Sequence, residues 1–324
     1  MNHHTMLRNV SRTFALSIEQ LPGVLGEAVA IAYLLFRVAD CIEDHPSLTG
    51  ERKAELLRLW AQVLRGESQL KALTGPLTAL DGTDPEVYVA QHAGDVLVQL
   101  HKLPEALQGI LISHVHKTSM GMARWQEHGP YVQDENEMDD YMHEVAGRVG
   151  YLLTDLFSWH SPSIRAQKEK LMPLGREFGL GLQTVNIIRG MRKDYARGWV
   201  FVPVAFYRSV GLTRDGLFDP ANRDRAMQVI DMLVSKAERH LMNGLKYTSL
   251  LPCMQRNIRL FCIWPLLFAV KTLAISRKNH DVLTSEAKIS RAQVTKIVFT
   301  AKLFFWSNAL LTLYYKKLFK PEPV

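Results

Sequence analysis

The stretch VLGEAVAIAYLLFRVADCIED, residues 24–44, decides the fold. Its apolar residues recur every three or four positions and no proline interrupts it, so it predicts one long, largely buried helix. The helix ends on three carboxylates, Asp40, Glu43 and Asp44. Positions i, i+3 and i+4 lie on one helical face. The stretch therefore predicts a core helix that ends in a cluster of acidic side chains.

The same helical periodicity continues through most of the 324 residues. Alternating patterns that would predict strands are nearly absent, and residues 199–204 form the one candidate. Length alone favours two domains, but without a linker or repeat the pattern predicts a single all-α domain spanning residues 1–324. Loops are expected at residues 74–76 and 198–221. The expected helices span residues 24–44, 49–64, 84–100, 104–125, 134–159, 161–194, 222–250, 254–277 and 285–319.

Composition restricts the class of protein. With 47% hydrophobic and 22% charged residues, the chain is not disordered. Three cysteines, none in a C-x-x-C pair, exclude a disulfide framework and a cysteine zinc site and fit a reducing cytoplasm. Residues 1–13 are polar, so no signal peptide is expected. The net charge of +7 suits phosphate-bearing ligands, nucleic acid or an anionic membrane, without choosing among them.

The acidic end of the first long helix has two interpretations. Carboxylate oxygens, together with phosphate oxygens and water, form the coordination shell that Mg²⁺ prefers. Alternatively, the acids are a solvated helix end and Arg37, one turn earlier, pairs with its acidic neighbours. Acidic side chains are unfavourable at the carboxyl end of a helix, because the helix dipole is negative there. Their presence therefore favours a functional role, such as metal binding, over a solvated helix end.

Residues 183–194 form a second polar constellation. Asn186, Gly190 and Asp194 follow at i, i+4 and i+8 and share a helical face. Four cations, at positions 189, 192, 193 and 197, surround Asp194 and give a local charge of 4 − 1 = +3. The alternative is a solvated basic helix end, which the dipole favours.

A third constellation spans residues 141–150 and contains Tyr141, Gly147 and Gly150. Glycine inside a helix costs about 1 kcal/mol against alanine, so something must approach the backbone closely. The approaching group is either a ligand or, more commonly, another helix. A lone helical tyrosine is ordinarily a packed ring with a bonded hydroxyl group.

Taken in order, residues 10–15, 33–44, 120–123, 141–150 and 186–189 resemble the motifs of the squalene/phytoene synthase family. Residues 261–265, FCIWP, resemble a segment typical of its squalene synthase branch. The resemblance covers residues 10–319. It implies an all-α isoprenoid-synthase fold around a central cavity, and head-to-head joining of two prenyl diphosphates. In that branch two farnesyl diphosphates give presqualene diphosphate, which is reduced by NADPH, and glycines such as Gly147 leave room for the chains.

The resemblance also implies roles for individual residues. Asp40 and Asp44 match the residues that hold Mg²⁺ on the departing diphosphate, with Glu43 assisting. Tyr141 matches the catalytic tyrosine, which would handle a proton or stabilise a cation. The residues that match diphosphate-site, cavity or cofactor positions are Ser11, Thr13, Tyr33, Arg37, Gln183, Asn186, Arg189 and Lys193, and Asn186 and Asp194 are also expected metal ligands.

One departure from the family stands out. The middle aspartate of its second motif, Asn-x-x-x-Asp-x-x-x-Asp, is Gly190 here. The hypothesis is that this helix binds its diphosphate with fewer metal ions and with more Arg and Lys. The alternatives are a synthase that stops at presqualene diphosphate, hydroxysqualene or a dehydrogenated or longer product, and a silent member that acts as a binding or assembly factor. No motif supports a nucleic-acid partner, and no oligomeric state is predicted.

The C-terminal segment predicts contact with a membrane surface. Residues 260–270 and 303–315 are apolar but too short to span a bilayer, and core helices are the favoured interpretation. In residues 286–324, however, seven basic side chains against two acidic ones alternate with large apolar residues. The pattern predicts peripheral, salt-sensitive association with an anionic membrane on its cytoplasmic face.

Overall fold

The structure is a computed structural model that describes residues 2–320, apart from the side chains of Arg12 and Thr13. It is all-helical, as expected. Within the described residues the one strand-like pairing is an isolated bridge between Tyr131 and Val200, in the segment that the sequence marks as a strand candidate. The chain divides into two compact units, which are described separately: Met1–Gly129 with Tyr151–Ala166, and Pro130–Gly150 with Gln167–Val324. The single-domain organisation stays a prediction.

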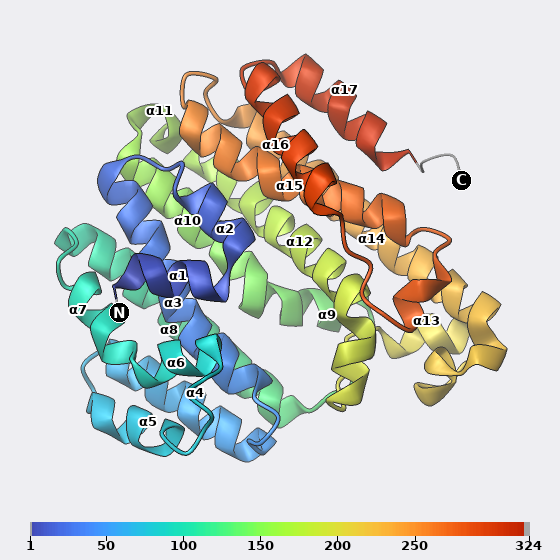
Figure 1. Cartoon of the computed structure of the whole chain (residues 1–324), viewed down its shortest axis with the longest axis horizontal. Helices are drawn as coiled ribbons and strands as arrows, with labels where there is room; N and C mark the ends of the chain where they lie inside the picture. The colour runs from blue at the N-terminus through green and yellow to red at the C-terminus, as the bar shows by residue number, and fades with distance from the viewer. Residues whose placement is uncertain (1, 321–324) are drawn as a thin grey trace. The chain divides into compact units, whose positions relative to one another are not determined.

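The first unit is built around α3, Gly23–Asp44 (Figure 1). Its side chains are buried on nearly all sides as far as Ile42, because α1, α4, α6, α7 and α8 all pack against it. Thr49 caps α4 by accepting a hydrogen bond from the amide of Arg52 at 3.3 Å. The remaining helices are α1 His3–Val10, α2 Arg12–Ile18, α4 Gly50–Leu64, α5 Leu70–Leu77, α6 Pro85–Gln91, α7 Ala93–Leu100, α8 Glu105–His128, most of α10 Arg148–His160 and α11 Pro162–Arg165.

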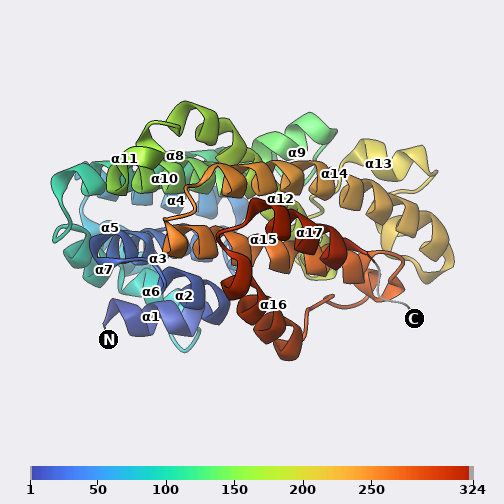
Figure 2. The same cartoon turned by 90° about the horizontal axis from the view of Figure 1, so that it is seen from above.

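The second unit is built around the long pair α12, Lys168–Ala196, and α14, Arg223–Leu250. α15, Arg256–Ser276, packs against both of them and is covered in turn by α16, Arg291–Phe304, and α17, Asn308–Phe319 (Figures 1 and 2). The remaining elements are α9 Glu135–Met142, the π-helix η1 His143–Gly147, α13 Val204–Ser209 and the short helices η2 Asp215–Phe218, η3 Pro220–Asn222 and η4 His280–Leu283.

Most expected helices form, but several are divided. The helix expected over 84–100 breaks at His92, and that over 161–194 is split into α11 and α12. The loop expected at residues 74–76 is wrong, because it lies inside α5, which contains Pro76. The helix expected over 285–319 breaks between α16 and α17, where Ser307 accepts a hydrogen bond from the amide of Leu310 at 3.3 Å and starts the second helix.

Arg259 explains where two of these helices end. It is fully buried in α15, yet its guanidinium group is satisfied by four acceptors. It donates to the carbonyls of Thr248 at 3.0 Å and Leu251 at 2.6 Å, at the end of α14. It also donates to the carbonyl of Phe305 at 2.7 Å and to Asn308 Oδ1 at 2.7 Å, across the break before α17. A buried charge is tolerated only with such partners, so Arg259 fixes both helix ends.

By length and composition α15 is apolar enough to cross a membrane, with a mean hydropathy of 1.8 in its most apolar window. Of that window, 89% is buried within the protein, and α15 also carries the buried Lys271. The uncharged run 260–270 is too short by itself, and α15 reaches spanning length only by including charged residues such as Lys271, while its interpretation as a core helix fits the burial.

Candidate active site

Arg37 stands at the centre of a group of polar side chains at the end of α3. Its Nε donates to the hydroxyl oxygen of Tyr33 at 3.1 Å, one turn back. Its Nη1 lies 3.1 Å from Glu86 Oε1 and 3.5 Å from Asp40 Oδ2. The carboxylates Asp40, Asp44 and Glu86, with Arg37 among them, are called the acidic cluster. Arg37 therefore pairs with Asp40, as the sequence allows, but also with Glu86 of α6, which sequence reasoning missed.

The acidic cluster holds more negative charge than Arg37 can neutralise. Burial raises the pKa of Asp40 to about 6; Arg37 opposes that shift, while Asp44 and Glu86 add to it. Burial also raises the pKa of the neighbouring Cys41 thiol to about 12, and the same acids contribute. Binding of another cation would stabilise the ionised form of an aspartate whose pKa is raised by burial and by neighbouring carboxylates.

The donors of the acidic cluster fit Mg²⁺ in kind. All are carboxylate oxygens, the hard ligands that this ion selects. Asp40, Glu43 and Asp44 lie on one helix but do not converge on a shared point closely enough to enclose an ion by themselves, among the residues described. Mg²⁺ usually keeps several waters and is bound through one or two carboxylates plus substrate phosphates, which matches such an open set.

Ser11 and Tyr33 extend the acidic cluster on its N-terminal side. The Ser11 hydroxyl caps α2 by accepting from the amide of Phe14 at 3.2 Å. Burial raises the pKa of Tyr33, and Arg37 and a hydrogen bond with Ser11 partly offset the rise. The Phe14 ring packs on Tyr33 with centroids 5.8 Å apart. The side chain of Thr13, also expected here, lies outside the described residues.

The end of α12 in the second unit carries the other expected residues. Asn186 Nδ2 donates to Gln183 Oε1 at 3.4 Å, and Asp194 accepts a hydrogen bond from Arg197. Lys193 is exposed. Together with Arg189 and Arg192 these residues are called the basic helix end. Because Asp194 already has a cationic partner, this group fits an anion better than a second metal ion.

Two arginines of the basic helix end differ in their surroundings. Arg192 lies over the rings of Tyr195 at 5.5 Å and Phe218 at 5.8 Å, which fixes its guanidinium group. Arg189 Nε is buried, and no described residue accepts a hydrogen bond from it. An unmet buried donor costs about 1–3 kcal/mol, so Arg189 is a group that an anionic ligand could satisfy.

Gly190 leaves open the place that an aspartate occupies in the family motif. A Cβ atom built at this position would lie 3.6 Å from Asp194 Oδ2, an ordinary contact distance. A side chain therefore fits at position 190, next to Asp194. Packing does not require glycine here, and the departure from the family pattern changes local charge instead of relieving a clash.

Tyr141 lies at the end of α9 and is 5% exposed. Its ring stacks on Phe201 with centroids 4.3 Å apart and an interplanar angle of 11°, and Phe201 stacks on Trp199 at 5.3 Å. A π-helix, η1, begins two residues later. Isolated π turns are frequent at functional sites. Sequence reasoning marked residues 199–204 only as a strand candidate and missed this aromatic stack.

The glycines that follow Tyr141 serve helix packing. A Cβ at Gly150 would lie 2.0 Å from the carbonyl oxygen of Gly175, and one at Gly179 would lie 2.3 Å from that of Ala146. At Gly147 it would meet Leu180 at 3.0 Å. These contacts place α12 directly against η1, so the packing interpretation is confirmed. The idea that Gly147 and Gly150 leave room for a substrate chain does not fit, because α12 occupies the space.

A charged network ties α9 to α14 and α12. Lys236, 1% exposed, contacts Asp139 at 2.5 Å and Glu135 at 3.3 Å. His240 Nδ1 lies 2.7 Å from Glu177, and its Nε2 lies 3.6 Å from Asp139. Burial lowers the pKa of His240, but the hydrogen bond with Glu177 and the nearby carboxylate of Asp139 outweigh it and raise the pKa above its ordinary value. The network anchors the helix that carries Tyr141.

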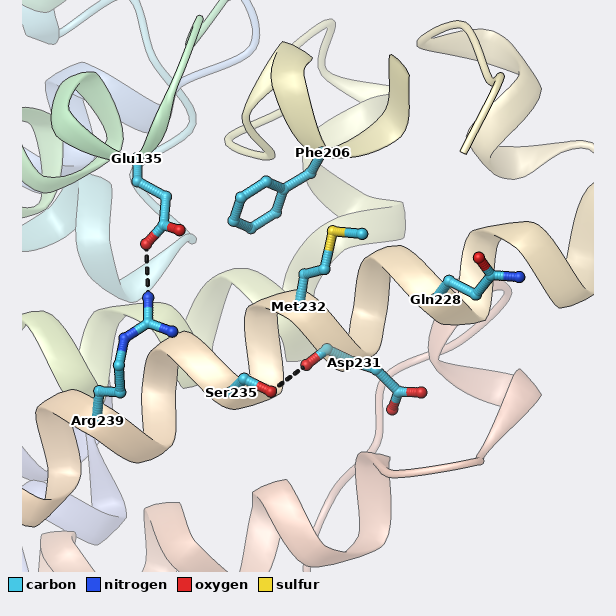
Figure 3. Close-up of a pocket in the computed structure, with 7 residues that line it drawn as sticks. All are labelled: Glu135, Phe206, Gln228, Asp231, Met232, Ser235 and Arg239. Atoms are coloured by element: carbon cyan, nitrogen blue, oxygen red, sulfur yellow. Dashed lines mark hydrogen bonds and ion pairs between the residues drawn. The ribbon is translucent and has the colours of Figure 1, made fainter. Parts of the chain in front are cut away.

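A pocket of about 520 Å³ opens beside this network, between α9, α13 and α14 (Figure 3). Arg239 donates to Glu135 at 2.6 Å across it, and Ser235 donates to the carbonyl oxygen of Asp231 at 2.8 Å. None of the expected site residues lines this pocket. The structure therefore assigns it no part in the candidate site.

Comparison with known proteins identifies the class. The family model described as squalene/phytoene synthase matches residues 7–293. Squalene synthase of Homo sapiens is 27% identical over 320 residues, which cover 98% of this chain and 73% of that protein. Lycopaoctaene synthase of Botryococcus braunii is 30% identical over 316 residues, covering 95% and 68%.

Solved structures agree on the fold. TcSQS, a squalene synthase solved with a ligand, has a TM-score of 0.80 at 23% identity and covers 97% of this chain and 90% of its own. A dehydrosqualene synthase has a TM-score of 0.67 at 17% identity, covering 93% and 94%. The chain belongs to the squalene/phytoene synthase family. It is a prenyltransferase, as expected, of a family that acts on prenyl diphosphates.

Proposed function

We propose that this protein joins two farnesyl diphosphates head to head to give presqualene diphosphate, and reduces that intermediate to squalene with NADPH. The observation that carries the proposal is the acidic cluster, in which Asp40 pairs with Arg37 at 3.5 Å and Asp44 adds to the raised pKa of Asp40, in a chain of this family. A silent binding protein would have no need to maintain an aspartate whose burial raises its pKa to about 6.

In the proposed reaction the acidic cluster holds the metal that the departing diphosphate needs. Asp40 and Asp44 would bind Mg²⁺ with Glu43 assisting, and Mg²⁺ would draw negative charge from the leaving diphosphate. Arg37 stays paired with Glu86 at 3.1 Å, so it positions Asp40 without cancelling the whole charge of the cluster. The allylic C–O bond of one substrate then breaks, and the double bond of the second attacks the resulting cation.

The basic helix end would hold the second diphosphate. Arg189 and Lys193 would contact its oxygens directly, and Arg192 keeps its orientation over Tyr195. Asn186 and Asp194 remain proposed metal ligands, but Asp194 would first have to release Arg197. We therefore assign fewer metal ions to this diphosphate than to the first.

Tyr141 would act where the cyclopropane ring of presqualene diphosphate forms. That step releases a proton from carbon, and the Tyr141 hydroxyl would receive it or stabilise the cation that precedes it. Stacking on Phe201 at 4.3 Å holds the ring in one orientation. Phe201 and Trp199 add aromatic faces to which carbocations are attracted. The remaining diphosphate would then leave, the cyclopropane ring would open, and NADPH would supply the hydride that neutralises the resulting cation.

The relatives leave the product open. One is named squalene synthase and another lycopaoctaene synthase, at 27% and 30% identity. Because the two names differ in product, a longer prenyl diphosphate should be tested as well, and an early-stopping or silent member is an alternative outcome.

Purified protein should be incubated with Mg²⁺ and either farnesyl or geranylgeranyl diphosphate, with and without NADPH, and the products identified by mass. Squalene formed only with NADPH supports the proposal. A product unchanged by NADPH indicates the early-stopping alternative, and no turnover of either substrate contradicts an enzymatic role.

A further inference from the structure

The last two helices of the second unit have an unusual charge. Residues 291–320 contain six basic side chains and no acidic one. The same segment holds five of the thirteen large hydrophobic residues that are exposed in the described part of the chain. A basic segment with exposed apolar side chains is typical of a surface that meets negative charge and an apolar phase together.

α16 divides into an inner and an outer face. Ile297, Ala301 and Phe304 are buried, where the helix packs on α15. Phe299 and Leu303 are 65% and 64% exposed. At about 100° per residue they lie roughly opposite Ala301 on the helix. The core is therefore covered by one face of α16, and the exposed apolar residues belong to the other.

α17 repeats this division. Leu311 and Tyr315 are buried against α15, whereas Leu310 and Leu313 are 42% and 65% exposed. Lys317 follows Leu313 by one turn and is also exposed. Both helices lie beside α15 (Figure 2) and pack on it, and their outer faces stay exposed among the described residues.

Trp306 lies in the short connection between the two helices and is 59% exposed. Tryptophan is enriched where an apolar phase meets water, because its ring is apolar and its N–H is polar. Lysines at such a surface extend their charged ends toward lipid headgroups while their stems remain in apolar contact. Exposed aromatic and lysine residues in one segment favour a lipid interface over an acidic protein.

We propose that the outer faces of α16 and α17 dock on an anionic lipid bilayer, with Phe299, Leu303, Trp306 and Leu313 entering the headgroup region. Residues 291–320 carry six basic side chains and no acidic one, so their positive charge complements the negative charge of such a membrane. A second copy of the chain is a poorer partner, because a two-fold contact through this surface would bring two sets of six positive charges together. The inference does not depend on the proposed reaction.

Vesicle flotation tests the docking surface. Wild-type protein should float with vesicles of phosphatidylcholine and phosphatidylglycerol at low salt, and much less with phosphatidylcholine alone. The double variant Leu303→Gln/Leu313→Gln should bind the mixed vesicles about tenfold less well or worse, because it removes apolar contact. The triple variant Lys296→Gln/Lys316→Gln/Lys317→Gln should lose about tenfold or more and most of its salt dependence.

Matched control variants distinguish loss of the docking surface from a general effect of net charge or of lower stability on vesicle binding. Lys71→Gln/Lys102→Gln/Lys117→Gln removes the same charge from exposed positions in the first unit and should float like wild type. Val98→Gln, at a site 55% exposed, is the apolar control. All variants should keep the wild-type Tm. The proposal is overturned if wild type stays unbound at low salt, if control and test variants lose equally, or if Leu303→Gln/Leu313→Gln breaks a dimer without changing lipid binding.

Discussion

The acidic cluster of α3 and the basic helix end of α12 come from motifs that look alike in sequence, since each repeats oxygen-bearing side chains at helical spacing. Their electrostatics differ. At the end of α3, Arg37 pairs with both Asp40 and Glu86, and burial raises the pKa of Asp40 to about 6. At the end of α12, Asp194 is bonded to Arg197, and further cations surround it. Two polar motifs at helical spacing thus produce one site that favours a cation and one that favours an anion.

The largest expected effect is at the acidic cluster. Asp40→Asn or Asp44→Asn removes a negatively charged ligand and should lower turnover by about 10³-fold, at the upper end of losses seen for electrostatic groups. Kinetics at saturating substrate and Mg²⁺ check this. Glu105→Gln, an exposed acid in α8, should behave like wild type. Normal turnover by either aspartate variant would contradict the proposal that the substituted residue binds Mg²⁺.

Tyr141→Phe should lower turnover by about 10²-fold, the range for a lost proton-transfer group. The ring would still stack on Phe201, so Tm should not change. Tyr207→Phe, another buried tyrosine of the second unit, is the control. A Tyr141→Phe variant with full activity but lower Tm would show that the Tyr141 hydroxyl contributes to stability and not to the reaction.

Asp40→Asn should also stabilise the protein in the absence of Mg²⁺. The pKa of Asp40 is raised in the folded state, so the folded protein binds more protons and wild-type stability falls as pH rises from about 4 to about 6. Above pH 6 the variant avoids a charge that the fold disfavours. The gain should be on the order of 1–2 kcal/mol, reduced from the full shift because the side chain is partly solvated.

Denaturant unfolding of wild type and Asp40→Asn, at pH 4 and at pH 7.5, measures this gain. The two proteins should differ little at pH 4, where Asp40 is almost fully protonated in the folded state and only about half ionised in the unfolded state. A variant that is less stable at pH 7.5 would mean that the ion pair with Arg37 outweighs the crowding by Asp44 and Glu86.

The smallest effect is expected at Gly190. Gly190→Asp places a second carboxylate beside Asp194, where there is room for it. If cations bind the diphosphate there, the added charge should raise KM several-fold at low Mg²⁺, and high Mg²⁺ should relieve it. Gly190→Asn is the neutral control. A Gly190→Asp variant with lower KM and a lower Mg²⁺ requirement would instead identify a metal site that lacks a ligand, and no change in either would make position 190 irrelevant.

Local pattern predicted the helices best where periodicity was long and uninterrupted. α3 and α14 begin within a residue of their expected positions because their apolar spacing is long and uninterrupted. The break before α17 was not foreseen, because it depends on Arg259 of another helix bonding to the carbonyl oxygen of Phe305. Helix ends that are fixed by distant side chains leave no local signal.

The candidate site follows the same rule. Asp40, Arg37 and Tyr33 lie on one helix, so their proximity could be derived from spacing. Glu86 could not, because nothing in the sequence shows that α6 lies along the acidic end of α3. The stacking of Tyr141 on Phe201 likewise joins segments sixty residues apart in the chain.

Metal binding tests the contrast between the two sites most directly. Mn²⁺, used as a paramagnetic substitute for Mg²⁺, should be titrated in the presence of inorganic pyrophosphate into wild type, Asp40→Asn and Asp194→Asn. We predict that Asp40→Asn loses the tightest Mn²⁺ site, whereas Asp194→Asn retains it with nearly unchanged affinity. Equal losses in the two variants, or loss in Asp194→Asn alone, would contradict it.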